Sequence, residues 1–391
     1  MLDRKRATVR DLRRDNRAAV LWSLYLDQPR SRHELSAATG LSAASVTNVI
    51  RELIDEGVVM ETGLVESDGG RPRAMLGINP EYGYVIGIDI GETRTRVELF
   101  DLAMTERAKV EYPLDQAAQH DVAVVVGQIA SGLAAVLAGS GVHEEAVLGV
   151  GIGVPGIIER GPEVLVHGQT YGWDAVPLQR LLRAHTDLPL RFDNGAKTMG
   201  QAELWFGAGR GTRNAVMVLI GSGTGASLIS GGATFQGATS SAAEFGHVTV
   251  AVGGRKCRCG ASGCLEAYVG ADPILERYGQ PMAADQELAL AELINAADAS
   301  PHAAAILDET AQYLGAGIGT LINLFNPERV IIGGWAGLLL GPRLLADIRE
   351  EARNHSLHHL FAATSIDLGQ LGPDAVARGA ATLPLETFLN G

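Results

Sequence analysis

Apolar residues near the start of the chain recur at helical spacing and are separated by polar breaks. The first such group is Ala18, Leu21, Trp22 and Tyr25. This spacing predicts a helix that ends at Pro29, because proline cannot continue a helix. Ser31 and Glu34 then have the spacing of a capping box, in which each side chain accepts a hydrogen bond from the other residue's backbone amide. We therefore expect a second, short helix that stops at Gly40.

A third predicted helix, capped by Ser42, has one apolar and one polar face. Its apolar positions form the stripe of a buried helix face: Val46, Val49, Ile50, Leu53 and Ile54. The opposite face carries Asn48 and Arg51, and Ser45 and Thr47 lie beside it. Asn48 and Arg51 have side chains that reach base edges, while Ser42 and Ser45 suit phosphate contacts. Two helices joined by a short glycine-containing turn predict a helix-turn-helix.

Two alternating stretches after the third helix predict a β-hairpin, or wing. The first strand is expected at 58–65 and the return strand at 74–78, with an extended Gly-Gly-Arg-Pro-Arg segment between them. Such a segment can place two arginines, Arg71 and Arg73, in a minor groove. Residues 1–80 are therefore predicted to form a winged helix-turn-helix that binds double-stranded DNA. A three-helix module without a role in DNA binding is the alternative.

From residue 84 onward, apolar strands end in glycine-rich turns. A predicted strand over 84–91 leads into a turn at 92–95, and 96–101 alternates as a second strand. The same design recurs around the turn Gly221–Gly225. This recurrence predicts an internally duplicated α/β fold in which each turn could cradle phosphate. The other elements expected here are strands at 189–192, 215–220 and 226–230 and helices at 122–137, 177–184, 287–297 and 303–325.

Composition and charge narrow the class of protein. The chain has 391 residues and is 46% hydrophobic and 20% charged, which is ordinary for a globular protein with a large core. We expect no membrane span, because we find no uncharged apolar run of ~18 residues. We also expect no signal peptide, because the N-terminus is charged. The net charge of −13 divides into +1 for residues 1–80 and −14 for the rest. This division favours a polyanion partner for the head alone, although a solvated basic tail gives a similar pattern.

The three cysteines of the chain lie within eight residues, at Cys257, Cys259 and Cys264, and His247 precedes them. An odd, tightly clustered set is a poor disulfide framework and a better metal site. Three thiolates and an imidazole form a four-ligand set for tetrahedral zinc, with no position left for water, so the zinc would be structural. Three reduced, buried cysteines without a metal are the alternative.

Two carboxylates, Glu244 and Glu266, flank the predicted zinc ligands in the sequence. A zinc-bound histidine has its second ring nitrogen free for a hydrogen bond, so His247 and these carboxylates are expected to form a rigid polar cluster. Carboxylates accept hydrogen bonds from sugar hydroxyls, which favours a polyhydroxylated ligand. Asp193 and Asn194, just after a predicted strand, are a third polar position, although an aspartate there is also typical of a turn or helix cap.

Together these motifs resemble those of the ROK family (repressors, open reading frames and sugar kinases), in particular its transcriptional regulators. The resemblance covers nearly the whole chain, and kinases of the family lack the N-terminal head. It rests on Asp89-Ile-Gly-Glu-Thr93, Gly153-Val-Pro-Gly156, Asp193-Asn194, Gly221–Gly225, Glu244-Phe-Gly-His247, Cys257–Glu266 and Ile331-Ile-Gly-Gly334. It implies an actin-like (RNase H-like) ATPase fold with two α/β lobes, a sugar cleft between them and zinc on the histidine and cysteines. It also implies sugar contacts by Asp193, Glu244, His247 and Glu266.

The nucleotide motifs depart from the pattern of the family's kinases. Their first phosphate turn, usually Asp-x-Gly-Gly-Thr-Lys, has Glu92 in place of the second glycine and Arg94 in place of the lysine. A carboxylate there repels phosphate. Trp335 stands where a third glycine is usual, and its indole could fill the nucleoside pocket. The second phosphate turn, Gly221–Gly225, is intact, so we expect no use of ATP but leave residual nucleotide binding open. Asp193, which matches the kinases' catalytic base, is then not catalytic.

The sequence as a whole predicts a sugar-responsive DNA-binding regulator, a repressor of carbohydrate-utilisation genes, which acts in the cytoplasm as a homodimer or homotetramer. Its expected parts are the head (1–80), a first lobe (81–192), a second lobe with the zinc knuckle (193–372) and a C-terminal segment that returns to the first lobe (373–391). Sugar binding would change lobe closure and so the spacing of two heads ~34 Å apart on DNA. Two alternatives are an ATP-dependent sugar kinase with an appended DNA-binding domain and a zinc scaffold whose head binds protein.

Overall fold

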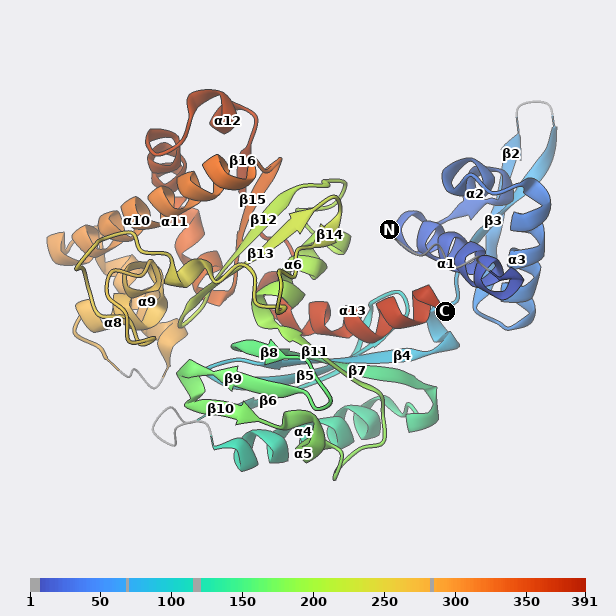
Figure 1. Ribbon diagram of the computed structural model, residues 1–391, viewed down its shortest axis with the longest axis horizontal. Coiled ribbons are helices and arrows are strands. Elements are labelled where there is room, and N and C mark those ends of the chain that lie inside the picture. Colours follow the sequence, from blue (N-terminus) through green and yellow to red (C-terminus); the bar gives the residue numbers. More distant parts are fainter. Residues whose placement is uncertain (1–7, 68–69, 115–120, 282–284) are drawn as a thin grey trace, which may run out of the picture.

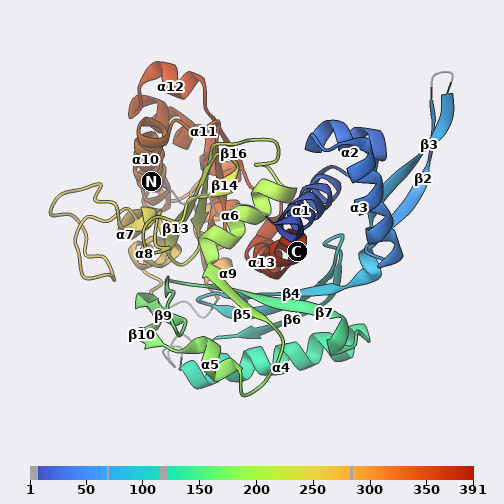
Figure 2. The same cartoon turned by 45° about the vertical axis from the view of Figure 1, so that its right-hand side comes forward.

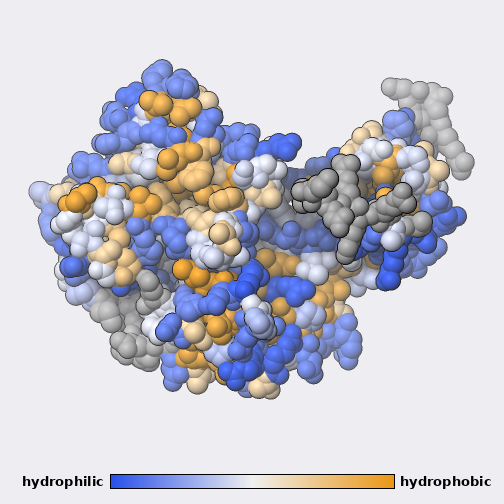
Figure 3. Space-filling view, in the orientation of Figure 1, coloured by the Kyte–Doolittle hydropathy of each residue, from blue (hydrophilic) through white to orange (hydrophobic). Residues whose placement is uncertain are grey.

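The computed structural model describes residues 8–67, 70–114, 121–281 and 285–391. They form a small N-terminal head and a larger body of two α/β lobes, with helix α13 (Ala375–Asn390) running between the lobes (Figure 1). The head lies at the C-terminal end of α13, and the turned view shows the same arrangement (Figure 2). The surface is hollowed between the head and the second lobe, and hydrophilic residues line that hollow (Figure 3).

The head consists of three helices and a small antiparallel sheet. The helices are α1 (Val9–Asp27), α2 (Arg32–Thr39) and α3 (Ala43–Asp55), and the strands β1 (Arg30–Ser31), β2 (Val59–Ser67) and β3 (Gly70–Ile78) are arranged in the order β1-β3-β2. The predicted capping box of α2 is confirmed, because the Ser31 hydroxyl accepts from the Glu34 amide and the Glu34 carboxylate accepts from the Ser31 amide. Val46, Ile50 and Leu53 of α3 are fully buried, as the apolar stripe predicts.

Two boundaries in the head differ from the sequence prediction. Helix α1 begins at Val9, earlier than the apolar spacing indicates, because the Thr8 hydroxyl caps it by accepting from the Asp11 amide. Strand β3 begins at Gly70 rather than at residue 74. The antiparallel pairing continues to Ser67 and Gly70, with a register irregularity on the way. The arginine-proline segment is therefore part of the hairpin ladder and not a free tip.

The first lobe is built on a mixed sheet in the order β11-β7-β4-β5-β6. Its strands are β4 (Tyr84–Ile90), β5 (Arg94–Asp101), β6 (Glu106–Pro113), β7 (Val147–Val154) and β11 (Leu190–Asn194). Helix α4 (Val122–Ser140) packs on β5 and β6, and α13 packs on β4 and β7 from the opposite face (Figure 1). A smaller sheet of β8 (Ile157–Glu159), β9 (Leu165–Gly168) and β10 (Trp173–Val176), followed by α5 (Leu178–Leu182), completes the lobe.

The second lobe repeats this topology with the sheet order β14-β13-β12-β15-β16. In each lobe the first three strands pair antiparallel and the last two run parallel to the first strand. The predicted internal duplication of an α/β fold is therefore confirmed. The strands are β12 (Ala215–Ile220), β13 (Thr224–Ser230), β14 (Ala233–Thr234), β15 (Arg329–Gly333) and β16 (Ser365–Leu368). The helices are α6 (Gly195–Phe206), α7 (Glu266–Val269), α8 (Ala271–Arg277), α9 (Gln286–Ala296), α10 (Pro301–Phe325), α11 (Trp335–Asn354) and α12 (His358–Ala362).

Helix α4 corrects the expectation that no uncharged apolar run is long enough to span a membrane. Its 19 residues carry no charged side chain, and within the described ranges it is the one helix whose length and hydropathy meet the criteria for a candidate span. Val125, Ile129 and Val136 are fully buried in the same apolar cluster as residues of β4, β5 and β7. Packing on a sheet therefore accounts for the apolar composition of this helix.

The head and the body share a hydrophobic core. Apolar residues of α1 belong to the same buried cluster as Leu385 and Leu389 of α13. The Trp22 ring meets the Trp205 ring edge-on, with centroids 5.1 Å apart, and Trp205 lies near the C-terminal end of α6. The Trp22 indole N–H also donates to Asn390 Oδ1 (2.9 Å). The head therefore packs against the ends of two body helices, and it also contacts body loops, as in the hydrogen bond that Arg210 donates to the Leu26 carbonyl at 2.6 Å.

Candidate functional site

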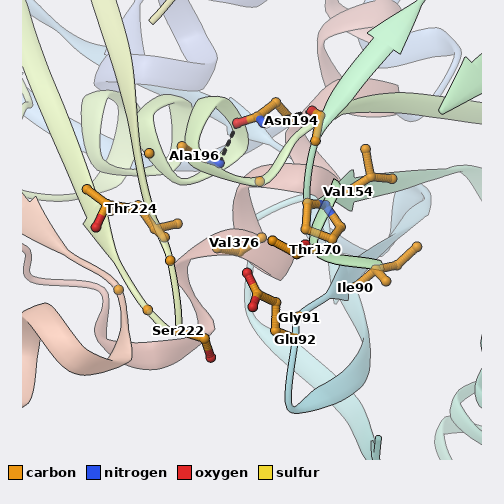
Figure 4. Close-up of a pocket in the computed structure, with 18 of the residues that line it drawn as sticks. Ile90, Gly91, Glu92, Val154, Thr170, Asn194, Ala196, Ser222, Thr224 and Val376 are labelled. Atoms are coloured by element: carbon orange, nitrogen blue, oxygen red, sulfur yellow. Dashed lines mark hydrogen bonds between the residues drawn. The ribbon is translucent and has the colours of Figure 1, made fainter. Parts of the chain in front are cut away.

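A cavity of about 320 Å³ lies between the two lobes. Its walls include both glycine-rich turns, the first residues of α6 and the start of α11. In Figure 4, Glu92 and Thr170 approach from the first-lobe side, while Ser222 and Thr224 face them from the second lobe. A concave, two-sided pocket of this volume is typical of a small-molecule site.

His247, Cys257, Cys259 and Cys264 converge beside this cavity. Their ligand atoms all lie within 4.8 Å of one another. Cys257 Sγ lies 3.7 Å from His247 Nδ1, and Cys259 Sγ lies 3.7 Å from Cys264 Sγ. Ligands on a tetrahedral zinc ion with Zn–S bonds of ~2.3 Å are spaced by ~3.7 Å. The four residues predicted from spacing are therefore brought together, and their geometry fits a tetrahedral metal ion.

Short-range backbone pairing forms the knuckle, residues 247–266, which carries these four candidate ligands. Isolated antiparallel bridges join Thr249 to Cys264 and Lys256 to Ser262. Within the loop, the Cys257 amide donates to the Ala261 carbonyl at 2.9 Å. These contacts fold the chain back on itself, which places ligands that are far apart along a loop around one point.

His247 and two carboxylates of the knuckle region line the cavity together. Glu266 is buried, and it accepts hydrogen bonds from the Thr224 amide and from Arg258 Nε, both at 2.9 Å. Burial alone would raise the pKa of Glu266, but the Arg258 charge and these hydrogen bonds outweigh it and lower the pKa. Burial raises the pKa of Glu244, in part against the attraction of His247 and Lys197. The predicted polar cluster is thus assembled, with one firmly ionised carboxylate.

The sequence pattern predicted Asp193 and Asn194 just after a strand, but in the structure they are the last two residues of strand β11. Asn194 lines the cavity and caps α6, because its Oδ1 accepts from the Ala196 amide at 2.8 Å (Figure 4). Asp193 is not among the described residues that line the cavity. Its Oδ1 accepts from the Asn194 amide, and its Oδ2 lies 3.4 Å from Gln236 Nε2 and 3.9 Å from Arg160. The capping role considered for this position is therefore filled by Asn194.

Arg258, which the sequence analysis did not single out, connects the knuckle to the first lobe. Its guanidinium donates to both oxygens of Glu92, at 2.7 and 2.9 Å, while its Nε donates to Glu266. A Cβ atom added at Gly223 would lie 1.9 Å from Arg258 Nη2, so the guanidinium packs directly on the second phosphate turn. Glu92 and Arg258 are 166 positions apart in the sequence. In the sequence, the one signal for this role of Arg258 was its position between Cys257 and Cys259, two of the predicted ligands.

Trp335 lies against the other part of the same turn. A Cβ atom added at Gly221 would lie 3.2 Å from the Trp335 indole nitrogen. Trp335 is the first residue of α11 and lines the cavity. The indole therefore occupies the side of the cavity at which the sequence analysis placed a nucleoside.

The first-lobe wall of the cavity carries buried acids and paired arginines. Burial raises the pKa of Asp89 to about 6, although Arg96 and Arg94 act against this shift. Arg94 pairs across the cleft with Glu287 of α9. Arg96 pairs with Glu111 at 2.8 Å, and also with Asp374 at the start of α13. The two positions of the first phosphate turn that depart from the kinase pattern, 92 and 94, thus both carry ion pairs between the lobes.

The described residues that were predicted to contact DNA are exposed or partly exposed on the head. Thr47, Asn48 and Arg51 of α3 are exposed, and Arg51 Nη2 donates to Asn48 Oδ1 at 2.6 Å. Ser42 caps α3, and its hydroxyl lies 2.9 Å from that of Ser45. Arg73 of β3 is also exposed, whereas the side chain of Arg71 lies outside the described residues.

The comparisons with known proteins place the chain in one family. The sequence profile of the ROK family matches residues 85–387, and the chain belongs to that family. It is 30% identical to a xylose repressor of Caldicellulosiruptor bescii over 97% of both chains. It is 31% identical to a glucokinase of Halalkalibacterium halodurans, over 77% of this chain and 94% of the glucokinase. Among solved structures, a ROK family transcriptional regulator described as a homologue of Escherichia coli MLC superposes with a TM-score of 0.78 at 26% identity, over 97% of both chains.

Proposed function

We propose that this protein is a sugar-responsive DNA-binding transcriptional regulator, a repressor of carbohydrate-utilisation genes that acts in the cytoplasm. The observation that carries the proposal is the division of the cavity: one end presents His247 and carboxylates, and the other end is filled by Arg258 and Trp335. The similarity to repressors extends over the head, whereas the glucokinase matches the body. A cavity whose glycine-rich turns are occupied by an ion pair and an indole suits an effector site better than phosphoryl transfer.

The knuckle is proposed to hold a structural zinc ion on His247, Cys257, Cys259 and Cys264. When bound, zinc supplies a fixed anchor for the imidazole and has no open coordination position. Because Nδ1 of His247 is the nitrogen nearest to Cys257, its Nε2 is left for a ligand in the cavity. The sugar is proposed to donate hydroxyl hydrogens to Glu244 and Glu266 and to contact Asp193 and Asn194. The cluster thus recognises hydroxyl groups at fixed positions.

Helices α6 and α13 are proposed to carry the effector signal to the head. Asn194 caps α6 inside the cavity, and Trp205 at the other end of that helix touches the head. Val376 of α13 lines the cavity, and Asn390 at its end bonds to the head. A Cβ atom added at Gly379 would lie 1.8 Å from the Thr198 carbonyl oxygen, so the two helices cross in direct backbone contact. A sugar that favours one lobe arrangement would therefore shift the head.

The head is proposed to be a winged helix-turn-helix. Asn48, Arg51 and Thr47 would face the bases of a major groove, Ser42 and Ser45 would bind phosphate, and the wing would direct Arg71 and Arg73 into a minor groove. A two-fold homodimer, or a homotetramer built from it, would place two such heads on a pseudo-palindromic operator. The exposed polar face of α3 supports this arrangement.

The test is binding of the zinc-loaded protein to a fluorescent fragment of its own promoter region, with and without a panel of sugars. We expect salt-dependent binding that one sugar changes by tenfold or more. The double variant Asn48→Ala/Arg51→Ala should weaken DNA binding by at least ~30-fold, because each good base contact contributes about 1–3 kcal/mol. Arg180→Ala, which removes a surface arginine paired with Glu163, is the matched control. DNA binding equal in the double variant and the control would instead favour a zinc scaffold whose head binds protein.

A sugar kinase with an appended DNA-binding domain is the second candidate. The intact Gly221–Gly225 turn and the similarity to the glucokinase favour it. The carboxylate at Glu92 and the positions of Arg258 and Trp335 act against it. A coupled assay for ADP across the sugar panel separates the two functions. Turnover of roughly 1 s⁻¹ or more, an ordinary enzyme rate, would replace the regulator proposal.

A further inference from the structure

We infer that Glu92 is a specificity residue: its bidentate bridge to Arg258 occupies the phosphate position of the cavity, so that the site accepts an uncharged sugar and rejects its phosphorylated form. This inference rests on the proposed sugar response, because it names the chemical class of that effector. It concerns a contact between the lobes that neither the family's sugar contacts nor its zinc ligands include.

The bridge lies where the two phosphate turns face each other. Glu92 is in the turn between β4 and β5, and Arg258 lies on Gly223 in the turn between β12 and β13. Both terminal nitrogens of Arg258 donate to Glu92, and its Nε donates to Glu266. The planar guanidinium is thus bonded along the two edges that would otherwise grip a phosphate. The chain's own carboxylate takes the place of the phosphate group.

The charges around the bridge also disfavour an anion. Three carboxylates lie near Arg258. Two of them are Glu92 and Glu266, and the third is Asp272, whose Oδ2 lies 3.6 Å from Arg258 Nη1. Among the described residues that line the cavity, the other two arginines are paired as well, Arg94 with Glu287 and Arg96 with Glu111. A phosphate entering the cavity would have to displace a carboxylate and remain close to the others. A neutral hydroxylated ligand meets no such repulsion.

Calorimetric titration of the zinc-loaded protein tests this inference. The ligands are glucose, mannose and N-acetylglucosamine, each beside its 6-phosphate, together with inorganic pyrophosphate as an anion that needs no sugar site. The proteins are the natural chain, Glu92→Gln, and Glu163→Gln. The first substitution removes the charge from the bridge and keeps its shape. The control removes a carboxylate that pairs with Arg180 at 2.8 Å on the surface of the first lobe.

For the natural chain and the control, we expect pyrophosphate binding too weak to measure and a 6-phosphate at least ~100-fold weaker than its parent sugar. In Glu92→Gln, pyrophosphate binding should become measurable, and the affinity for the phosphorylated sugar relative to the free sugar should rise by tenfold or more. A 6-phosphate that binds the natural chain as tightly as its parent sugar would overturn the inference and leave the proposed function standing. So would unchanged pyrophosphate affinity in a folded Glu92→Gln protein. A third outcome is that pyrophosphate affinity rises in Glu92→Gln while no sugar of the panel changes binding to the promoter fragment. The role of Glu92 would then stand, and the proposed function would fail.

Discussion

The two ends of the interlobe cavity use charged groups in opposite ways. At the knuckle end, His247 and Glu244 line the cavity with a ring nitrogen and carboxylate oxygens, and Glu266 is shared with Arg258, whose Nε donates to it at 2.9 Å. At the end formed by the glycine-rich turns, the charged groups neutralise one another, as Glu92 does with Arg258, and the Trp335 indole lies against Gly221. The cavity therefore presents polar side chains at one end and ion-paired side chains at the other. The knuckle end is held by four convergent ligands and the other by single side chains, so the two ends should respond differently to substitution.

The largest effect is expected when the knuckle end is broken. His247→Ala removes one of four metal ligands and the imidazole that faces the cavity, so zinc affinity and sugar affinity should each fall by at least ~100-fold. Metal analysis after dialysis and calorimetry with the effector sugar measure the two losses. Far-ultraviolet circular dichroism and promoter binding report whether the fold persists. A variant that holds zinc and binds sugar normally would show that the two ends do not differ in the way described above.

The knuckle end was predictable from the sequence, and the closed end was not, for a physical reason. Three cysteines and a histidine within eighteen residues are a local pattern, and tetrahedral zinc needs those ligands at such spacing. The alternation of strands and glycine turns likewise predicted both lobes. The Glu92–Arg258 bridge depends on how the two lobes pack, which no local spacing encodes. Two other features were mispredicted because they depend on a packing partner. Strand β3 begins at Gly70 because β2 pairs with it there, and helix α4 is long and apolar because it packs on a sheet.

The second effect concerns pH and acts on the first-lobe wall behind the closed end. Neither oxygen of Glu98 has a hydrogen-bond partner among the described residues, and its nearest cations are Arg96 at 3.7 Å and Lys109 at 3.8 Å. Burial, with a smaller contribution from Asp374, raises the pKa of Glu98 to about 8. Between pH 4.5 and 8 the folded state thus holds a proton that the unfolded state has released, and the free energy of unfolding falls as pH rises.

Glu98→Gln should remove this dependence, because glutamine does not titrate. From pH 5 to pH 8 the natural chain should lose about 2 kcal/mol of stability relative to the variant. This is less than the full loss that linkage gives for one carboxyl whose pKa rises from 4.5 to about 8. Urea unfolding at each pH measures the difference. Glu266→Gln is the comparison at the knuckle end. The pKa of Glu266 is lowered, so its contribution is present at neutral pH and is lost as pH falls below the ordinary value. Equal pH slopes for the natural chain and Glu98→Gln would contradict the description of the wall.

A smaller effect is expected at Asp193, which lies behind the knuckle end. Among the described residues, its Oδ2 lies 3.4 Å from Gln236 Nε2 and 3.9 Å from Arg160, and we expect this loosely held carboxylate to turn toward a sugar hydroxyl. Asp193→Asn keeps the shape and removes the charge, and it should weaken sugar binding about tenfold, as the loss of one charge-assisted hydrogen bond does. DNA binding without sugar should stay within threefold, with Glu163→Gln as the control. Loss of DNA binding in a folded variant would place Asp193 in the coupling to the head instead.

The smallest effect on the sugar is expected at Trp335, and this makes it the sharpest comparison of the two ends. Trp335→Ala uncovers Gly221 without touching the knuckle, so sugar affinity should change by less than threefold. The uncovered surface alone should give no tight binding of a non-hydrolysable ATP analogue, because the Glu92–Arg258 bridge still occupies the phosphate turns. Adding Glu92→Gln to Trp335→Ala should raise the affinity for the analogue by more than the two single substitutions combined. Calorimetry on the four proteins measures this coupling. Tight analogue binding by Trp335→Ala alone would show that the indole, and not the ion pair, closes that end of the cavity.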